Sequence, residues 1–226
     1  MCGRFANAQP RARLVRLFGA VPLEGTDAPR WNIAPGMEAL VLRCKPGSLE
    51  RHLDYLRWGL LPHFIADPAR ARRPINARAE TVATTPMFRD AFAHRRCLVP
   101  ADAFYEWRRG PAGKTPYAVA RADGQPLALG GIWEGWRGAD DTVERSFAIL
   151  TTGANATMAP IHDRMPVVVE EADWPVWLGE APGDAAALLH PAAEGVLRVW
   201  PVSRAVNNPR NEGAELLAAV GVEGKS

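Results

Sequence analysis

Residues 96–133, RCLVPADAFYEWRRGPAGKTPYAVARADGQPLALGGIW, contain the pattern that decides the fold. Short runs rich in β-branched, aromatic and other apolar residues alternate with Asp, Gly and Pro, which commonly form turns. The stretch therefore predicts four consecutive strands joined by short connections. They are expected at residues 96–101, 103–109, 115–123 and 126–133.

The same pattern continues on both sides of this stretch. Towards the N-terminus, residues 38–44 and 50–59 flank the turn residues KPGS and predict a hairpin. Towards the C-terminus, strand-like runs are found at residues 144–152, 165–170 and 197–203. Many short strands with a few helices are typical of an α+β fold, here with antiparallel sheets forming a barrel-like core and a few flanking helices.

Two of the predicted helices carry clear end signals. Pro10 near the start and Gly19 at the stop bracket the first of them. In the second, Thr85 is the expected N-cap and Pro86 the first helical residue. All the helices are expected at residues 10–20, 85–94, 172–179 and 183–190.

The composition is that of a globular chain. Of 226 residues, 47% are apolar and 23% are charged, which is close to ordinary usage and unlike a disordered protein. The longest apolar runs span only a few residues, and no charged segment followed by a long apolar one opens the chain. We therefore expect one domain over residues 1–226, with about the last ten residues frayed, in a monomeric, soluble and cytoplasmic protein.

The charge is unevenly distributed, although the net charge is only +2. Residues 1–110 carry 18 basic and 10 acidic side chains, whereas residues 111–226 carry 9 and 15. Arg accounts for 24 of the 27 basic residues, and its planar guanidinium suits phosphate. The N-terminal half could therefore face nucleic acid, or Arg could simply fill solvated positions in a chain rich in Ala and Arg. Charge alone favours the second interpretation.

Three cysteines, Cys2, Cys44 and Cys97, are odd in number and widely spaced. They match neither a disulfide framework nor the paired spacing of a zinc site. The sequence also lacks the motifs of a phosphate-binding loop, a zinc protease and a serine hydrolase. We expect no metal and no cofactor.

Cys2 directly follows Met1, and removal of Met1 would make it the first residue. It would then carry a primary amine and a thiol two carbons apart. With an ordinary pKa near ~7.8, about 14% of such an α-amine is neutral at pH 7, against about 0.04% of a Lys side chain. The amine can form an imine with a carbonyl group, and the thiol can then close a stable thiazolidine ring. Alternatively, Cys2 is an N-terminal nucleophile that attacks an amide, or a terminal thiol without a role.

Three further polar residues lie where they could carry chemistry. Glu106 is flanked by Tyr105 and Trp107, and a carboxyl among aromatic rings is suited to moving protons. His162 lies in a Pro-flanked loop that leads into a strand, a good place for an acid or base. Asn76 could hydrogen-bond an amine or a sugar hydroxyl. Each also has a structural alternative: Glu106 could point to solvent, His162 could be a surface residue, and Asn76 could fix a turn.

A second group of residues suggests contact with single-stranded DNA. Arg78 and Arg164 each follow a candidate polar residue by two positions. The segment RWGLLPHF (57–64) places Trp58 and Phe64 near a proline. Positioned arginines beside aromatic rings match what single-stranded DNA requires, because phosphates bind cations and bases stack on rings.

Taken together, these segments resemble the SOS response-associated peptidase (SRAP) family, whose members sense abasic sites in DNA. The resemblance covers the chain from Cys2 to about Asn207 and rests on motifs in the order and spacing of that family. In chain order they are MCGRF, WNIAPG, RWGLLP, NARAE, RRCLVPADAFYEW, KTPY, SFAILTTGAN, IHDRMP and VSRAVN.

The resemblance implies a role for each candidate in the reaction. Cys2 would bond covalently to the ring-opened aldehyde of an abasic site in single-stranded DNA and give a thiazolidine. Asn76 would position the Cys2 amine and the sugar. Glu106 would move protons while the sugar ring opens and the imine forms. His162 would be a second acid or base that also serves reversal of the link.

The resemblance also implies the DNA contacts. Arg4, Arg78 and Arg164 would clamp phosphates, and Phe64 and Trp107 would lie against the strand. Phe64 stands where a Trp is common in the family, which weakens the base stacking expected there.

Three functions follow from these residues, in order of preference. The first is a covalent sensor of abasic sites that joins the nucleoid when it is bound to DNA. The second is a self-processing peptidase with Cys2 as nucleophile, which the family's name suggests. The third is a non-covalent module for single-stranded DNA.

Ala103 stands where a Gly is frequent in the family. We expect this small change to leave the chemistry unaffected.

Overall fold

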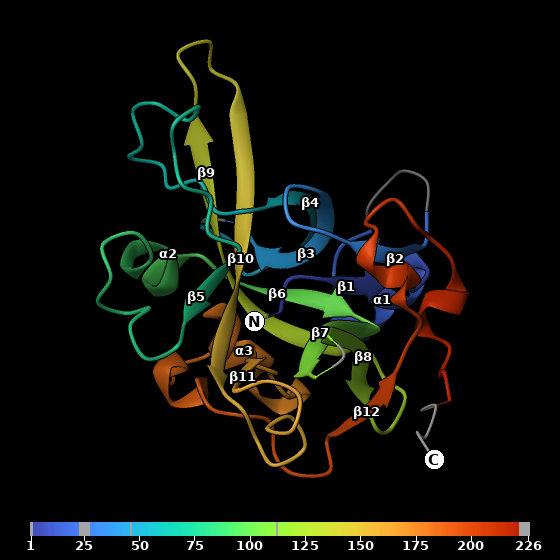
Figure 1. Cartoon of the computed structure of the whole chain (residues 1–226). Coiled ribbons are helices and arrows are strands. Elements are labelled where there is room, and N and C mark those ends of the chain that lie inside the picture. Colours follow the sequence, from blue (N-terminus) through green and yellow to red (C-terminus); the bar gives the residue numbers. More distant parts are fainter. Residues whose placement is uncertain (1, 23–27, 46, 112, 222–226) are drawn as a thin grey trace.

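The computed structural model describes residues 2–22, 28–45, 47–111 and 113–221. Within these residues the strands form two sheets, and short helices lie around them (Figure 1). Over the same residues, no helix is long and apolar enough to span a membrane.

Strands of the larger sheet close into a barrel. Each strand of the barrel pairs with the next, and the last pairs with the first, so no edge is left between them. This closure confirms the barrel-like core predicted from the sequence. In order around the barrel the strands are β10 (Val143–Gly153), β4 (Arg51–Trp58), β3 (Glu38–Cys44), β6 (Arg96–Ala101) and β9 (Leu127–Arg137).

The smaller sheet is antiparallel throughout and packs against the barrel. A shared apolar core joins the two sheets, with Phe5 and Phe104 from the smaller sheet and Trp58 and Phe147 from the barrel. The ring of Phe5 meets that of Trp58 edge-on at 5.1 Å. The order of its strands is β12 (Leu197–Pro201), β8 (Gly113–Arg121), β7 (Ala103–Gly110), β1 (Phe5–Asn7) and β2 (Arg30–Ile33).

β10 departs from the antiparallel arrangement expected for the whole fold. It pairs in parallel with β4 and with β5 (Asn76–Arg78), and in antiparallel fashion with β9 and β11 (Arg164–Pro166). A parallel pair needs a long crossover connection, and residues 59–142 provide it between β4 and β10. The C-terminal end of β10 is thereby flanked by β5 and β11, the strands that carry several candidate site residues.

The first predicted helix is confirmed as α1 (Arg11–Phe18). Gly19 ends it in the left-handed region, with φ of 59°, which favours glycine. The second, α2 (Arg89–His94), begins later than the predicted N-cap at Thr85. The Thr85 carbonyl accepts hydrogen bonds from the Phe88 and Arg89 amides, so a turn precedes the regular helix.

The two short helices predicted after residue 170 are present in reduced form. The first consists of a 3-10 turn, Glu171–Asp173, followed by α3 (Trp174–Leu178). The second is only a 3-10 turn at Ala185–Leu188. Further 3-10 turns lie at Arg204–Asn207 and Ala214–Leu217.

The strand predicted at 165–170 is shorter than expected, because β11 ends at Pro166. The backbone of the next residues bonds first to one strand of the barrel and then to another, instead of pairing with a single strand. The Val167 amide donates to Leu150 on β10, and the Val169 amide donates to Ala128 on β9.

The chain just before residue 222 makes backbone contacts in the structure. The Val220 amide donates to the Pro201 carbonyl, and Ala219 forms a bridge with Val202. Residues 222–226 lie outside the described part of the chain.

Candidate functional site

Cys2 lies just before β1, in the core shared by the two sheets, and its side chain is fully buried. β1 is paired with β7 so that Phe5 lies opposite Phe104. The Tyr105 amide continues this ladder by donating to the Arg4 carbonyl at 2.9 Å. Extending the register by one more pair brings the backbone just after Cys2 level with Glu106.

Asn76 holds the backbone of Cys2. Its Nδ2 donates to the Cys2 carbonyl oxygen at 2.9 Å, although the two residues are 74 positions apart. β5 presents Asn76 from the edge of β10, where it is paired with Ile149. The larger sheet thus fixes Asn76, and Asn76 in turn connects that sheet to the N-terminal segment.

Glu106 points into the core and not to solvent, the alternative that the sequence left open. It is 5% exposed and shares a face of β7 with Phe104, as the two-residue period of a strand requires. Its Oε1 accepts from the Trp107 amide at 3.2 Å. The carboxyl therefore lies on the inner face of the smaller sheet, on the same side as Cys2.

The Cys2 thiol is held in its neutral form. Burial is the main cause that raises its pKa, and the nearby negative charge of Glu106 raises it further. At neutral pH the sulfur therefore keeps its proton.

His162 lies two residues before the start of β11, and its side chain is 27% exposed. Its Nδ1 accepts from the Arg164 amide at 3.0 Å, which places the proton of the neutral ring on Nε2. The Asp163 carboxylate lies 2.8 Å from the same Nδ1. It can accept a hydrogen bond from this nitrogen only when Nδ1 carries a proton. β5 and β11 both pair with β10 at Thr151, but Asn76 pairs with Ile149, whereas His162 lies beyond the pair of Arg164 with Gly153.

The arginines expected to bind phosphate differ in how many hydrogen bonds they already make within the protein. Arg4 is half-buried, and its Nη1 donates at 2.8 Å to both Asn32 Oδ1 and the Val206 carbonyl. The guanidinium lies over the Trp107 ring at 5.9 Å. Burial lowers the pKa of Arg4 from its ordinary value. Arg78, by contrast, is exposed at the end of β5.

Arg164 forms a two-pronged ion pair with Glu80, and its Nη2 also donates to the Thr151 carbonyl. The pairing holds the pKa of the Glu80 carboxyl below its usual value, with Arg78 adding to the effect. A phosphate at Arg164 would therefore have to displace Glu80. Sequence reasoning missed Glu80 and Asn32, although both lie within quoted motifs, NARAE and WNIAPG.

The two candidate aromatic contacts are also placed by their neighbours. Phe64 is 53% exposed, and its ring lies edge-on to that of His63 at 5.5 Å. His63 in turn contacts the buried carboxylate of Glu134 at 3.2 Å. Trp107 Nε1 donates to Asn207 Oδ1 at 2.7 Å. Both rings are thus fixed from behind while part of each stays open.

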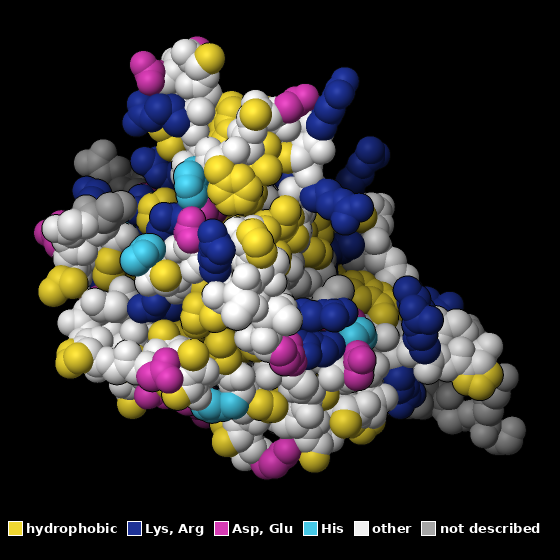
Figure 2. All heavy atoms as spheres, turned by 90° about the vertical axis from the view of Figure 1, so that its left-hand side faces the viewer, with side chains coloured by type: hydrophobic (Ala, Val, Ile, Leu, Met, Phe, Trp, Pro, Cys, Tyr) yellow, Lys and Arg dark blue, Asp and Glu magenta, His cyan; other side chains and the backbone are white. Residues whose placement is uncertain are grey.

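Figure 2 shows one face of the molecule with Lys and Arg side chains on both its left and right sides, and with histidine and acidic side chains among them. Over the described residues, no cluster of three or more His, Cys, Asp or Glu side chains could hold a metal ion. The candidate residues Cys2, Glu106, Asn76 and His162 carry a thiol, a carboxyl, an amide and an imidazole.

The sequence model of the SOS response associated peptidase (SRAP) family matches residues 1–209. The chain belongs to this family. The resemblance inferred from the motifs is therefore confirmed.

Curated relatives of this SRAP protein match it over nearly its whole length. A protein named Abasic site processing protein YedK, from Escherichia coli (strain K12), is 36% identical over 231 residues, which cover 97% of this chain and 100% of the relative. Abasic site processing protein YoqW from Bacillus subtilis (strain 168) is 34% identical over 223 residues, covering 96% and 99%. A protein from Bacteroides thetaiotaomicron with a solved X-ray structure aligns over 97% of this chain and 100% of its own, with a TM-score of 0.85 and 20% identity, and so shares the fold.

Proposed function

We propose that this protein forms a covalent bond with abasic sites in single-stranded DNA through Cys2, once Met1 has been removed. The observation that carries the proposal is the placement of Cys2. Its carbonyl accepts a hydrogen bond from Asn76. Burial, and to a lesser extent the charge of Glu106, raises the pKa of its thiol. The names of the curated relatives, which are abasic site processing proteins, support the same substrate.

The reaction begins with the closed sugar of the abasic site. Glu106 transfers protons between the ring oxygen and the anomeric hydroxyl, so that the ring opens to an aldehyde. The α-amine of Cys2 adds to C1′, forming a carbon–nitrogen bond, and the former aldehyde oxygen leaves as water. The product of this step is an imine.

The second step closes the ring. The Cys2 sulfur adds to C1′ of the imine, and the thiol proton passes to the nitrogen. No oxidant or reductant is needed, and the overall change is the loss of one water. Because burial and Glu106 keep the pKa of the thiol high, the sulfur enters with its proton and after the amine.

The remaining residues orient the strand and move protons. His162 offers Nε2–H as a second proton donor on the side of β11. Arg78 is exposed and can meet a phosphate, whereas Arg164 does so by exchanging Glu80. Arg4 supports the Trp107 ring from behind, and bases beside the lesion stack on the open faces of Trp107 and Phe64.

The test is denaturing electrophoresis after the protein is mixed with a single-stranded oligonucleotide that contains one abasic site. The wild-type protein should give a shifted, heat-stable species, and Cys2→Ala should give none unless borohydride traps the imine that its α-amine can still form. Cys2→Ser should give a species only when borohydride traps the imine, since it keeps the amine and lacks the sulfur. Cys44→Ser is the matched control for loss of a thiol and should react like the wild type.

Two other results would point to the remaining functions. Peptide cleavage that depends on Cys2 and ignores DNA would identify a peptidase. Equal, fully salt-reversible binding of intact and abasic strands, with no shifted species, would identify a non-covalent module. Either result would overturn the proposal.

A further inference from the structure

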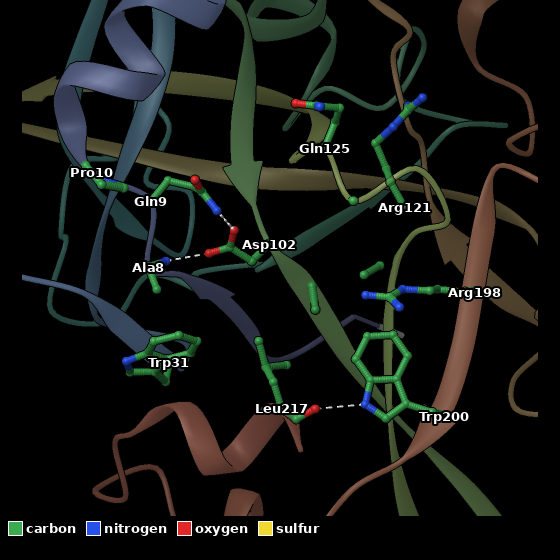
Figure 3. A pocket seen from close by; sticks show the side chains of 13 residues that line it. Ala8, Gln9, Pro10, Trp31, Asp102, Arg121, Gln125, Arg198, Trp200 and Leu217 are labelled. Atoms are coloured by element: carbon green, nitrogen blue, oxygen red, sulfur yellow. Dashed lines mark hydrogen bonds between the residues drawn. The ribbon is translucent and has the colours of Figure 1, made fainter. Parts of the chain in front are cut away.

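A hollow lies on the opposite face of the smaller sheet from Cys2. Its volume is about 370 Å³, and Ala103 and Ala120 contribute to its lining (Figure 3). Since side chains alternate along a strand, Ala103 faces away from the side occupied by Glu106, three residues further along β7. The small alanine side chains leave open the space into which larger residues would project.

Two indole rings stand on separate sides of this hollow, and hydrogen bonds hold the backbone of one residue and the ring of the other. The Trp31 backbone is held at both ends: its amide donates to Glu212, and its carbonyl accepts from the Tyr105 hydroxyl at 2.8 Å. The Trp200 ring is held by its Nε1, which donates to the Leu217 carbonyl at 2.8 Å. The Trp200 ring, held in this way, loses little freedom when a flat ligand stacks on it.

The polar groups of the hollow have opposite character at its two ends. Arg198 is exposed and stacks over Trp200 at 4.8 Å, and over the described residues no carboxylate forms an ion pair with it. On the side next to Trp31 (Figure 3), the Asp102 carboxylate accepts from the Ala8 amide and from Gln9 Nε2. An ionised carboxylate has about four acceptor positions, so Asp102 can accept further donors.

We propose that this hollow binds a nucleotide, with its base against Trp31 and Trp200, its phosphate on Arg198 and N–H donors on the base edge turned to Asp102. A flat ring with an anionic group at one end and donors at the other is what these groups complement. Guanine is favoured over adenine because its N1–H and 2-amino group are adjacent donors for one carboxylate. The inference does not depend on the chemistry of Cys2.

The nucleotide can come from two sources, a free nucleotide or a base of the DNA strand held at Cys2. Both present the same chemistry to the hollow. Their difference is whether the ligand is tethered, and that difference can be tested separately.

The experiment uses the full chain labelled with 5-fluorotryptophan and observed by fluorine NMR. Trp31→Phe and Trp200→Phe assign the two signals. Deoxyguanosine monophosphate should shift both signals at lower concentration than deoxyadenosine monophosphate, and inorganic phosphate should shift neither. The site does not exist if both signals stay fixed at millimolar nucleotide, or if only other tryptophans respond.

Two variants separate the roles of the polar groups. Arg198→Ala should weaken nucleotide binding by roughly fivefold, whereas Arg137→Ala, which removes an exposed charge from β9, should not change it. Asp102→Asn should reduce the preference for guanine over adenine by about tenfold while leaving adenine binding unchanged. Equal losses for both bases would contradict the assigned role of Asp102.

To find where the nucleotide comes from, the same fluorine NMR measurement is made on protein that is first crosslinked to an abasic oligonucleotide with guanines beside the lesion. If the strand supplies the base, crosslinking alone shifts the Trp31 and Trp200 signals and blocks the mononucleotide. If it does not, the free nucleotide still binds. Arg198→Ala should crosslink a short abasic oligonucleotide normally, so failure of this site and failure of the Cys2 reaction give different results.

Discussion

The hydrogen bond from Asn76 to the Cys2 carbonyl helps to hold the residue that we propose reacts with DNA. Asn76→Ala removes the only side-chain donor that we assign to this carbonyl. Displacement of a reacting group by about 1 Å can cost roughly 100-fold in rate, so crosslinking should slow by about ten- to 100-fold. The rate is measured from the time course of the shifted species.

Asn155→Ala is the matched control, because Asn155 Nδ2 makes a similar bond to the Ala192 carbonyl at 3.0 Å. It should reduce stability by about 1 kcal/mol and leave the crosslinking rate of the folded protein unchanged. If both variants slow crosslinking equally, Asn76 has no positioning role.

Glu106 should affect both the rate and the thiol. Glu106→Gln keeps the shape but cannot exchange protons as a carboxyl does, so crosslinking should slow by about 10²- to 10⁴-fold. It also removes a charge that raises the pKa of the Cys2 thiol. The pH at which iodoacetamide labels Cys2 should therefore move to lower values, while burial keeps it above that of a free thiol.

Glu38→Gln is the control for loss of a carboxylate, since Glu38 is exposed on β3. It should match the wild type in both measurements. An unchanged labelling profile in Glu106→Gln would show that its charge does not reach the thiol.

The candidate residues differ in how far sequence alone could locate them. Cys2 and Glu106 stand out because local context marks them: one follows Met1, and the other lies among aromatic residues of a strand. That Glu106 faces inward could not be read locally, because both faces of β7 carry apolar residues. The partnership of Arg164 with Glu80 joins residues 84 positions apart and depends on β10 lying between their strands.

At the scale of elements, β9 pairs with β6 and β10 in the barrel and packs closely against both at Gly131. A Cβ at Gly131 would lie 3.0 Å from Cys97 Sγ and 3.1 Å from the Ala148 carbonyl oxygen, on the neighbouring strands. Gly131→Ala should therefore lower the free energy of unfolding by about 1–3 kcal/mol, as overpacked cores do. Urea denaturation measures the change.

Gly153→Ala on β10 provides the comparison, because no atom lies within 4 Å of a Cβ built there. It should change stability by less than about 0.5 kcal/mol. Equal effects of the two substitutions would mean that the barrel does not require a small residue at position 131.

Elements with local end signals were predictable, and those shaped by distant contacts were not. Pro10 and Gly19 mark α1, and the KPGS turn marks the β3–β4 hairpin, so both follow from sequence. The apolar run at 165–170 is typical of one strand. In the structure its amides donate first to a carbonyl of β10 and then to a carbonyl of β9. Barrel closure by a parallel contact between β10 and β4 likewise has no local signal.

At the scale of the whole molecule, buried thiols make stability depend on alkaline pH. Burial raises the pKa of both Cys2 and Cys97, and that of the partly buried Cys44 to about 12. The folded state thus holds these protons more tightly than the unfolded chain. Stability is complete below the ordinary thiol pKa of about 8.5 and falls above it, by up to ~1.4 kcal/mol per pH unit for each fully buried thiol.

Cys97→Ala isolates this effect, because Cys97 is fully buried and lies outside the proposed reaction. Between about pH 8 and pH 10, the free energy of unfolding should fall less steeply in the variant than in the wild type. Parallel curves would contradict the assignment of a raised pKa to Cys97.

The proposed function depends on a covalent bond between Cys2, as the first residue once Met1 is removed, and a sugar that has lost its base. Intact-mass spectrometry of the protein, before and after exposure to an abasic single-stranded oligonucleotide, measures this most directly. The account predicts that the free protein lacks Met1, and that the joined species has the summed mass less one water with the DNA attached at Cys2. Retention of Met1, attachment at another residue, or no joined species would contradict it.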